Sequence, residues 1–148
     1  MSSIEKTISI SLTVKNTADA ISFYEKAFDA KELYRIPLPD GGIAHAEFMI
    51  KDTRVFISDQ SEDWSAKAIE EGEVAPCLFV LLTENCDQSF QKAISAGAEK
   101  VLEPADYFFG VRVGAVKDPF GYRWSFRQVL EEVSNDEIKR RAKELFGT

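Results

Sequence analysis

His45 and Glu47 are the residues of this sequence best suited to proton transfer. His45 is the only histidine, and Glu47 follows it two positions later. Side chains two apart on a strand point to the same face, so a strand here places the imidazole beside the carboxylate. Such a pair can act as a general acid and base. It can equally be an ordinary hydrogen-bonded pair on a half-exposed strand, and both interpretations stay open.

A second set of residues suits the binding of anions. Arg123, Ser125 and Arg127 alternate with three aromatic residues, which predicts a strand with one polar and one aromatic face. The aromatic face should pack under a helix. Guanidinium groups on the other face suit carboxylate or phosphate groups. The alternative is that these arginines lie on a solvated strand and bind nothing.

Arg112 and Ser9 could add to a polar pocket. Arg112 lies between Val111 and Val113, which we expect to form the buried face opposite it, so that Arg112 faces a pocket or solvent. Gly114 beside it would leave room for a ligand or another backbone. Ser9 lies on the hydroxyl-bearing face of the first predicted strand.

These residues lie on strands of a repeated unit. Residues 8–14 alternate as a strand, and Asn16 then caps an amphipathic helix. Residues 77–82 form a second apolar strand, followed by a helix that Gly97 closes. Three strand candidates follow each helix, at residues 31–36, 43–50 and 54–58 in the first half and at 99–102, 111–116 and 122–127 in the second.

The predicted fold class is α+β, with two βαβββ repeats forming a cupped mixed sheet, plus a C-terminal helix. Each unit has a helix on one face of its sheet, so two units must cooperate to shape the other face. Ser134 and Glu137 form a capping box that predicts a helix over about 134–146. We expect one domain over residues 1–148, with repeat 1 at about 7–60 and repeat 2 at about 75–128.

The charge balance argues against nucleic acid as a partner. Lys and Arg number 18 against 25 Asp and Glu, so the formal net charge is −7 and the average field repels phosphate backbones. No apolar run approaches the ~20 residues that span a bilayer, and no secretory signal pattern is present. We expect no membrane partner and a cytoplasmic location. Cys77 and Cys86 are expected to stay reduced, with Cys77 buried in a strand and Cys86 at a helix start.

The paired βαβββ units and the turn at Asp118, Pro119, Phe120 and Gly121 resemble the vicinal-oxygen-chelate superfamily of glyoxalases, bleomycin resistance proteins and dioxygenases. Second units of that superfamily typically carry an Asp-Pro-x-Gly turn here. The resemblance covers residues 8–146. The chain is most similar to the PhnB-like branch, because residues 110–114 approximate its glycine-aspartate-x-arginine-x-glycine stretch and a similar helix ends the chain.

Metal-dependent members of this superfamily take their ligands from the first and last strands of each unit, facing the cup. The resemblance places these positions at Ser9, Leu78, Ser125 and approximately Ile57. None of them is His, Glu, Asp or Cys, and a transition metal needs three or four such donors. We therefore expect no metal and no other cofactor.

The family orientation implies a cup lined by ligand-binding residues, namely Ser9, His45, Glu47, Arg112, Arg123 and Ser125. We expect a protein that binds a small organic or anionic ligand there. One alternative is an enzyme, a lyase, isomerase or dioxygenase that uses a metal completed across a dimer or the His45 and Glu47 pair. Another is a scaffold with an empty cup, since the fold alone cannot choose among chemistries.

Self-association is the other expected partnership. The family resemblance implies a homodimer, and Trp64, Tyr107, Phe108 and Phe109 lie where loops or strand edges are predicted. Symmetric pairing would remove such apolar area from water. The same aromatic side chains could instead close the domain's own core or cover a ligand.

Overall fold

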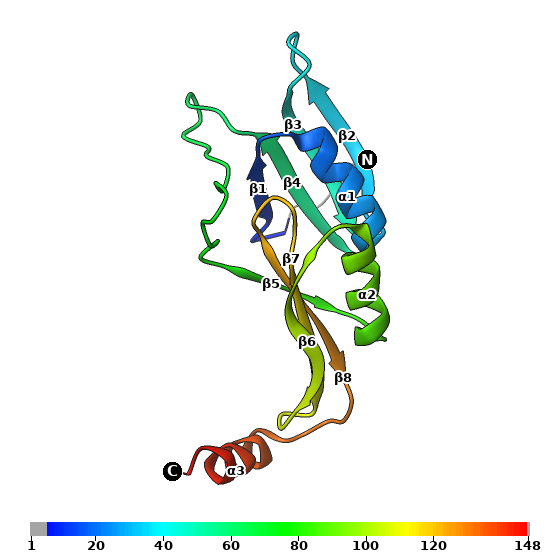
Figure 1. Cartoon of the computed structure of the whole chain (residues 1–148), viewed down its shortest axis with the longest axis vertical. Coiled ribbons are helices and arrows are strands. Elements are labelled where there is room, and N and C mark those ends of the chain that lie inside the picture. The colour runs from blue at the N-terminus through cyan, green and yellow to red at the C-terminus, as the bar shows by residue number, and fades with distance from the viewer. Residues whose placement is uncertain (1–5, 148) are drawn as a thin grey trace. The chain divides into compact units, whose positions relative to one another are not determined.

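A computed structural model describes residues 6–147, and the chain forms two compact units, residues 1–74 and 75–148. Each unit holds a four-stranded mixed sheet and a helix that follows its first strand. A third helix ends the second unit (Figure 1). The predicted α+β class, with two βαβββ units and a C-terminal helix, is therefore confirmed.

The first unit contains β1 (Ile10–Val14), α1 (Thr17–Phe28), β2 (Lys31–Pro37), β3 (Ile43–Ile50) and β4 (Thr53–Asp59). Its sheet order is β1-β4-β3-β2, in which β1 runs parallel to β4 and the other pairs are antiparallel. The Asn16 side chain accepts a hydrogen bond from the Asp19 backbone N–H, which confirms the predicted helix cap. Tyr24 of α1 stacks on Phe48 of β3, so α1 covers one face of this sheet.

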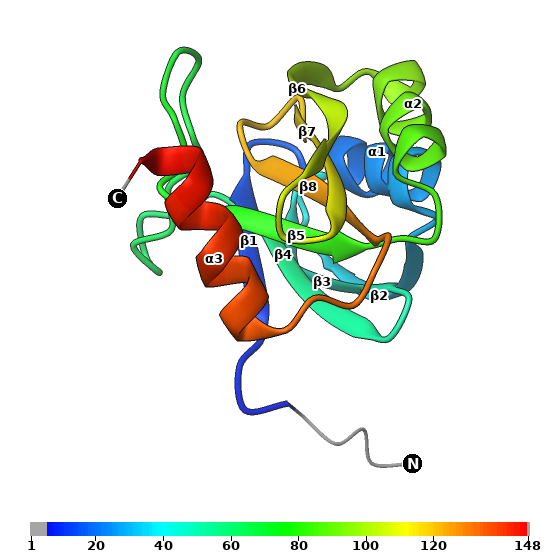
Figure 2. The ribbon, with the colours of Figure 1, turned by 90° about the horizontal axis from the view of Figure 1, so that it is seen from below.

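The second unit repeats this plan with β5 (Leu78–Leu82), α2 (Cys86–Ala96), β6 (Glu99–Tyr107), β7 (Val111–Lys117) and β8 (Arg123–Val129). Its sheet order is β5-β8-β7-β6, and β5 runs parallel to β8. Figure 2 shows α2 beside this sheet. A Cβ atom on Gly114 of β7 would lie 3.3 Å from the Phe90 ring of α2, so the glycine lets the helix approach closely.

The turn between β7 and β8 is built around a buried carboxylate. Asp118 accepts hydrogen bonds from the backbone N–H groups of Phe120 and Tyr122, and Gly121 adopts a positive φ of 96°. The second carboxylate oxygen accepts from the indole N–H of Trp124, at 2.9 Å. The predicted Asp-Pro-x-Gly turn is thereby confirmed, and it anchors the start of β8.

The terminal helix α3 (Asn135–Phe146) has the predicted cap, because Ser134 Oγ accepts from the backbone N–H of Glu137. It contains no buried residue. Arg141 donates to the carbonyl of Phe108 at 2.9 Å, and the Phe108 and Phe146 rings meet edge to face. The helix thus contacts the β6–β7 turn and, through an ion pair between Arg141 and Glu131, the segment that follows β8; Figure 1 shows it at the end of the second unit.

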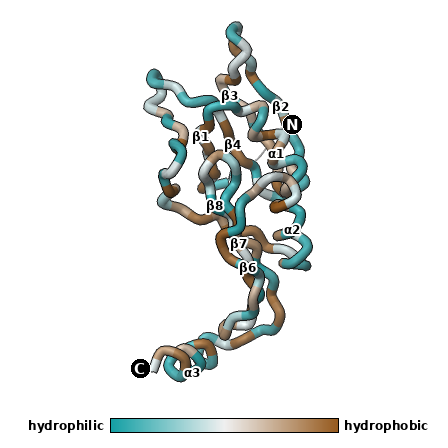
Figure 3. The backbone as a smooth tube through the Cα atoms, in the orientation of Figure 1, coloured by the Kyte–Doolittle hydropathy of each residue, from teal (hydrophilic) through white to brown (hydrophobic). Residues whose placement is uncertain are grey.

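Cross-strand register assigns the residues of each sheet to a face under the helix or to the opposite face, here called the helix-free face. The first helix-free face carries Ser11, Thr13, Tyr34, His45, Glu47, Met49, Arg54, Phe56 and Ser58. The second helix-free face carries Leu78, Val80, Leu82, Val111, Val113, Ala115, Arg123, Ser125 and Arg127. Figure 3 shows the mixture of hydrophobic and hydrophilic positions along the strands.

Two expectations about the second unit need correction. Cys77 is exposed and precedes β5, whereas Cys86 is buried at the start of α2 as expected. The β6 strand continues to Tyr107, five residues beyond the predicted end at Leu102. Within residues 6–147, no helix combines the length and apolar character needed to cross a membrane.

Candidate functional site

Glu47 lies at the centre of a polar cluster on the first helix-free face. The Tyr34 hydroxyl donates a 2.6 Å hydrogen bond to Glu47 Oε2, and His45 Nε2 lies 2.9 Å from the same oxygen. Arg54 approaches the other oxygen, Oε1, at 3.5 Å. We call Tyr34, His45, Glu47 and Arg54 the Glu47 cluster. It confirms that His45 and Glu47 lie side by side.

Three neighbouring strands build this cluster. Tyr34 of β2 is the direct cross-strand partner of Glu47 on β3, and Arg54 of β4 is the partner of Met49. The turn between β3 and β4 has only two residues, so Arg54 pairs with Met49, which lies two positions along β3 from Glu47 and on the same face. Tyr34 and Arg54 were not among the site residues predicted from the sequence.

The environment of Glu47 favours its ionised form. Burial, the largest single influence, would raise the pKa of this carboxyl because its side chain is only 11% exposed. Hydrogen bonds from Tyr34 and His45, with the positive charges of His45 and Arg54, outweigh burial and lower the pKa. The shared hydrogen bond with Glu47 raises the pKa of Tyr34. Glu47 is therefore held as a carboxylate within the cluster.

A hollow of about 360 Å³ lies next to the Glu47 cluster on the first unit. Arg54 and Ser9 line it together with Met49 and Phe56 of the helix-free face. Ser9 is exposed and lies just before β1, because that strand begins at Ile10. The structure thus brings Ser9 to the same hollow as Arg54, without a direct contact to His45 or Glu47.

A second polar group lies on β8. Arg123, Ser125 and Arg127 share the second helix-free face, while Trp124 and Phe126 are buried under α2. Ser125 is buried, and Arg127 stacks over the Phe109 ring with 5.6 Å between the guanidinium carbon and the ring centroid. The predicted division of β8 into an aromatic and a polar face is confirmed.

The two arginines of β8 differ from every other arginine in the chain. Within residues 6–147 neither has a carboxylate at ion-pair distance. Arg123 donates only to the carbonyl of Ala75, at 3.4 Å, and its Nε atom is buried without a hydrogen-bond partner. The remaining arginines each pair with Asp or Glu: Arg35, Arg54, Arg112, Arg140 and Arg141.

Arg112 lies opposite Val111 and Val113, as expected, but on the face of β7 under α2, so its predicted place among the cup-lining residues needs correction. Its Nε donates to Asp87 of α2 and its NH1 to Asp106 of β6, both at 2.9 Å. These contacts place it under α2, on the same side as Gly114. The paired carboxylates raise the pKa of Arg112. Arg112 therefore links α2 to the sheet.

The donor set does not fit the metal that the superfamily resemblance implies. Leu78 and Ser125 lie on the second helix-free face, and Ser9 lies beside the first. Ile57, the approximate fourth position, points toward α1 and is fully buried, so its place on the helix-free face is taken by Phe56. Among residues 6–147, no three His, Cys, Asp or Glu side chains form a group that could hold a metal ion.

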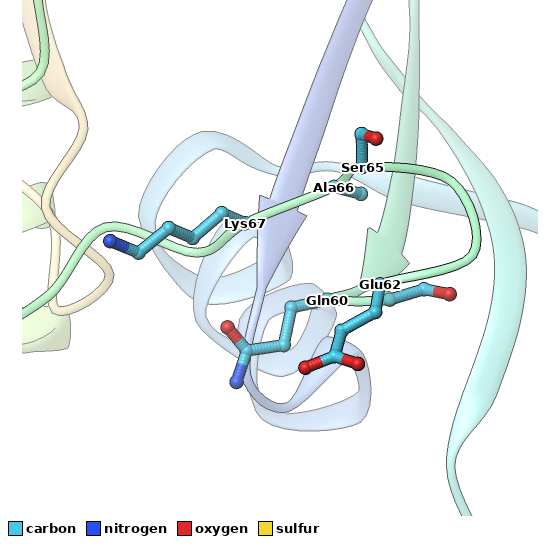
Figure 4. A pocket seen from close by; sticks show the side chains of 6 residues that line it. Gln60, Glu62, Ser65, Ala66 and Lys67 are labelled. Atoms are coloured by element: carbon cyan, nitrogen blue, oxygen red, sulfur yellow. The ribbon is translucent and has the colours of Figure 1, made fainter.

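Another hollow, of about 530 Å³, lies in the linker after β4 and is lined by residues 60–62 and 65–67. Figure 4 shows that its side chains diverge. Gln60 and Glu62 extend to one side, Ser65 to the other, and Lys67 runs away from both. This hollow lacks converging polar groups and is not a candidate site.

Sequence comparison connects the chain to a known superfamily. The profile of the Glyoxalase/Bleomycin resistance protein/Dioxygenase superfamily matches residues 6–126. An uncharacterized protein of Mycobacterium tuberculosis is 39% identical over 139 residues, which cover 92% of this chain and 82% of that protein. An uncharacterized protein of Arabidopsis thaliana is 30% identical over 133 residues, covering 84% and 78% of the two chains.

Solved structures share the fold. The structure of the Arabidopsis thaliana gene product gives a TM-score of 0.67 at 25% identity, over 84% of this chain and 100% of that one. TioX from Micromonospora sp. ML1 gives 0.68 at 21% identity, over 85% and 100%. The fosfomycin resistance protein FosX from Listeria monocytogenes, complexed with Mn(II) and sulfate ion, gives 0.67 at 16% identity, over 95% and 99%.

Proposed function

The chain belongs to the glyoxalase/bleomycin resistance protein/dioxygenase superfamily, and we propose that within it the chain binds a small organic anion rather than a catalytic metal. The proposed ligand lies on the second helix-free face, against Arg123 and Arg127. We also propose that the chain belongs to the PhnB-like branch of this superfamily, which residues 110–114 resemble.

The observation that carries this proposal is the absence of acidic partners for these two arginines within residues 6–147. A guanidinium that is partly withdrawn from water and lacks a counterion is costly, so such groups are usually paired. A carboxylate or phosphate on the ligand would supply the missing charge and accept hydrogen bonds from the guanidinium N–H groups of Arg123 and Arg127.

Binding of matched anions tests this function. Calorimetric titration of the full chain with benzoate and phenylphosphonate, against benzamide as the neutral analogue, should show binding of the anions only. The double variant Arg123→Gln and Arg127→Gln should bind at least about tenfold more weakly, as expected when a hydrogen bond to a charged group is lost. Arg140→Gln is the control, because Arg140 pairs with Glu137 and Glu144 on α3.

The anion-binding function fails if no anion binds the wild type, or if the double variant binds as tightly as the wild type. Circular dichroism of each variant separates loss of binding from loss of folding. Binding should also weaken as salt is raised, because added ions screen partly exposed charges.

A second function, general acid–base catalysis, is favoured by the contact of His45 with Glu47 beside the 360 Å³ hollow. Since the cluster holds the carboxylate ionised, His45 can exchange a proton through its other ring nitrogen. Exchange of pyruvate methyl protons with D₂O, followed by NMR, tests this chemistry. His45→Gln should abolish the exchange, and a wild-type rate no faster than buffer contradicts it.

A further inference from the structure

The arginines of β8 lie beside a row of exposed aliphatic side chains. Parallel pairing places Leu78 opposite Arg123 and Leu82 opposite Arg127, on strands about 4.8 Å apart. Val80 pairs with Ser125 between them. A charged row on β8 and an aliphatic row on β5 therefore run side by side along the second helix-free face.

The aliphatic row is available to a ligand. Leu78, Val80 and Leu82 are 49%, 55% and 64% exposed, which is unusual for three successive residues on one strand face. The β5 strand is the edge of its four-stranded sheet, so no strand within that sheet lies on its outer side. Apolar area on this row would be stabilised by contact with the hydrocarbon part of a ligand.

The two guanidinium groups without a carboxylate partner in residues 6–147 lie at the ends of this surface, and Lys117, the cross-strand partner of Arg123 on β7, forms an ion pair with Glu99. Arg123 and Arg127 are four residues apart, which corresponds to about 13 Å along a strand. Ser125, midway between them, is 4% exposed and offers little polar area, whereas its neighbour Val80 is half exposed. The surface is thus cationic at each end and apolar in the middle.

From this pattern we propose that the second helix-free face binds an elongated organic dianion, an aliphatic α,ω-dicarboxylate of about eight to ten carbons, given the ~13 Å spacing of the arginines. Each carboxylate accepts hydrogen bonds from one guanidinium, and the methylene chain lies along Val80. The proposal rests on the anion-binding function proposed above and names the class of its ligand.

The geometry of each end favours a carboxylate. Within residues 6–147 neither Arg123 nor Arg127, which lies over the Phe109 ring, pairs with a carboxylate, so each guanidinium can donate to a planar bidentate anion. A ligand with one carboxylate would satisfy only one end. A short diacid could not reach both arginines at once, so the affinity of the site should depend on the length of the diacid.

The test is calorimetric titration of the full chain with sebacate, a ten-carbon diacid, compared with succinate, decanoate and 1,10-decanediol. Sebacate should bind at least about tenfold more tightly than each of the other three, since it alone gains both charged ends and the apolar middle. Arg123→Gln and Arg127→Gln should each reduce sebacate binding to the level of decanoate. Arg140→Gln should leave it unchanged.

A further variant tests the apolar middle without touching either arginine. Val80→Asn should weaken sebacate several-fold and leave the weak binding of succinate as it is. Circular dichroism confirms that each variant is folded.

The outcomes separate the two proposals. Equal binding of sebacate and decanoate, or sensitivity to only one arginine, overturns the dicarboxylate and leaves anion binding intact. Binding of none of the organic anions, benzoate and phenylphosphonate included, overturns both.

Discussion

The indole Nε1–H of Trp124 donates a hydrogen bond of 2.9 Å to Asp118 Oδ2, and each residue is 1% exposed. The other oxygen of Asp118 accepts from the backbone of the β7–β8 turn. One buried carboxylate therefore shapes the turn and satisfies the indole that follows it. This pair holds the strand that carries Arg123 and Arg127.

We predict that Asp118→Ala lowers the free energy of unfolding by about 2–3 kcal/mol, because the buried Trp124 indole N–H and two turn N–H groups lose their acceptor. Urea denaturation at pH 7 measures the loss. Asp40→Ala is the matched control, since Asp40 shapes the β2–β3 turn through a single exposed hydrogen bond. Equal losses for the two variants would contradict the role of Asp118.

The Glu47 cluster predicts a dependence of stability on acid. Because the pKa of Glu47 is lower in the folded chain than its ordinary value of 4.5, its contribution is fully present above that pH. It is lost as the pH falls through the folded-state pKa. Urea denaturation between pH 7 and pH 3 should therefore show a wild-type advantage over Glu47→Gln that shrinks below pH 4.5.

Two companion variants sharpen the acid experiment. Tyr34→Phe removes a donor to Glu47 and should flatten the same pH dependence in part. Glu62→Gln, an exposed residue of the linker, should follow the wild type. A wild-type advantage that stays constant from pH 7 to pH 3 would argue that Glu47 is not the titrating group.

Arg112 should contribute to stability and not to ligand binding. Arg112→Gln removes two ion pairs between α2, β7 and β6, so we expect a small drop in melting temperature that diminishes at high salt. Anion affinity should stay at the wild-type value. A loss of anion affinity in this variant, with no change in melting temperature, would indicate that Arg112 takes part in ligand binding.

We predict that the purified protein carries no stoichiometric transition metal, because Ser9, Leu78, Phe56 and Ser125 occupy the places where metal ligands would be needed. Elemental analysis of freshly purified protein measures this directly. One zinc, iron, manganese or nickel ion per chain, removed by chelator with a loss of melting temperature, would reverse the prediction.

A homodimer in solution remains our expectation. Trp64 is 85% exposed, and Leu145 and Phe146 of α3 are 63% and 66% exposed, which leaves apolar area that a second copy would cover. Light scattering at micromolar concentration should give a mass of twice 16.6 kDa. A mass near 16.6 kDa at every concentration would rule the dimer out.

The elements could be predicted because their signals are local. The caps at Asn16 and Ser134 each accept the expected backbone hydrogen bond, and Gly97 ends α2. The apolar residues of β5 indicated a strand but not its exposure. Exposure depends on what covers the face away from α2, and no pattern within the strand specifies that.

The sequence could predict only those residues of the candidate site whose relative positions depend on spacing within one strand or on a short turn between two strands. His45 and Glu47 follow from their spacing, and Arg54 could have been added because the Lys51 and Asp52 turn fixes the β3–β4 register. Tyr34 could not have been predicted as a neighbour of Glu47, because two irregularities interrupt the pairing of β2 with β3.

Arg112 was assigned to the wrong face because its valine neighbours look like core residues. The packing of Phe90 over Gly114 determines which side of β7 lies under α2, and that side includes Arg112. A contact between a helix and a glycine is not visible in the alternation of one strand.

The parallel pairing of the first strand of each unit with its last has a consequence for synthesis on the ribosome. Ile10 of β1 finds its partner Val55 only after the intervening helix and two strands have emerged, so β1 waits as an unpaired edge. The first sheet can be complete once Asp59 has left the exit tunnel, before any residue of β5 has emerged from it. The chain is thus organised for folding in two successive stages, each closed by its own final strand.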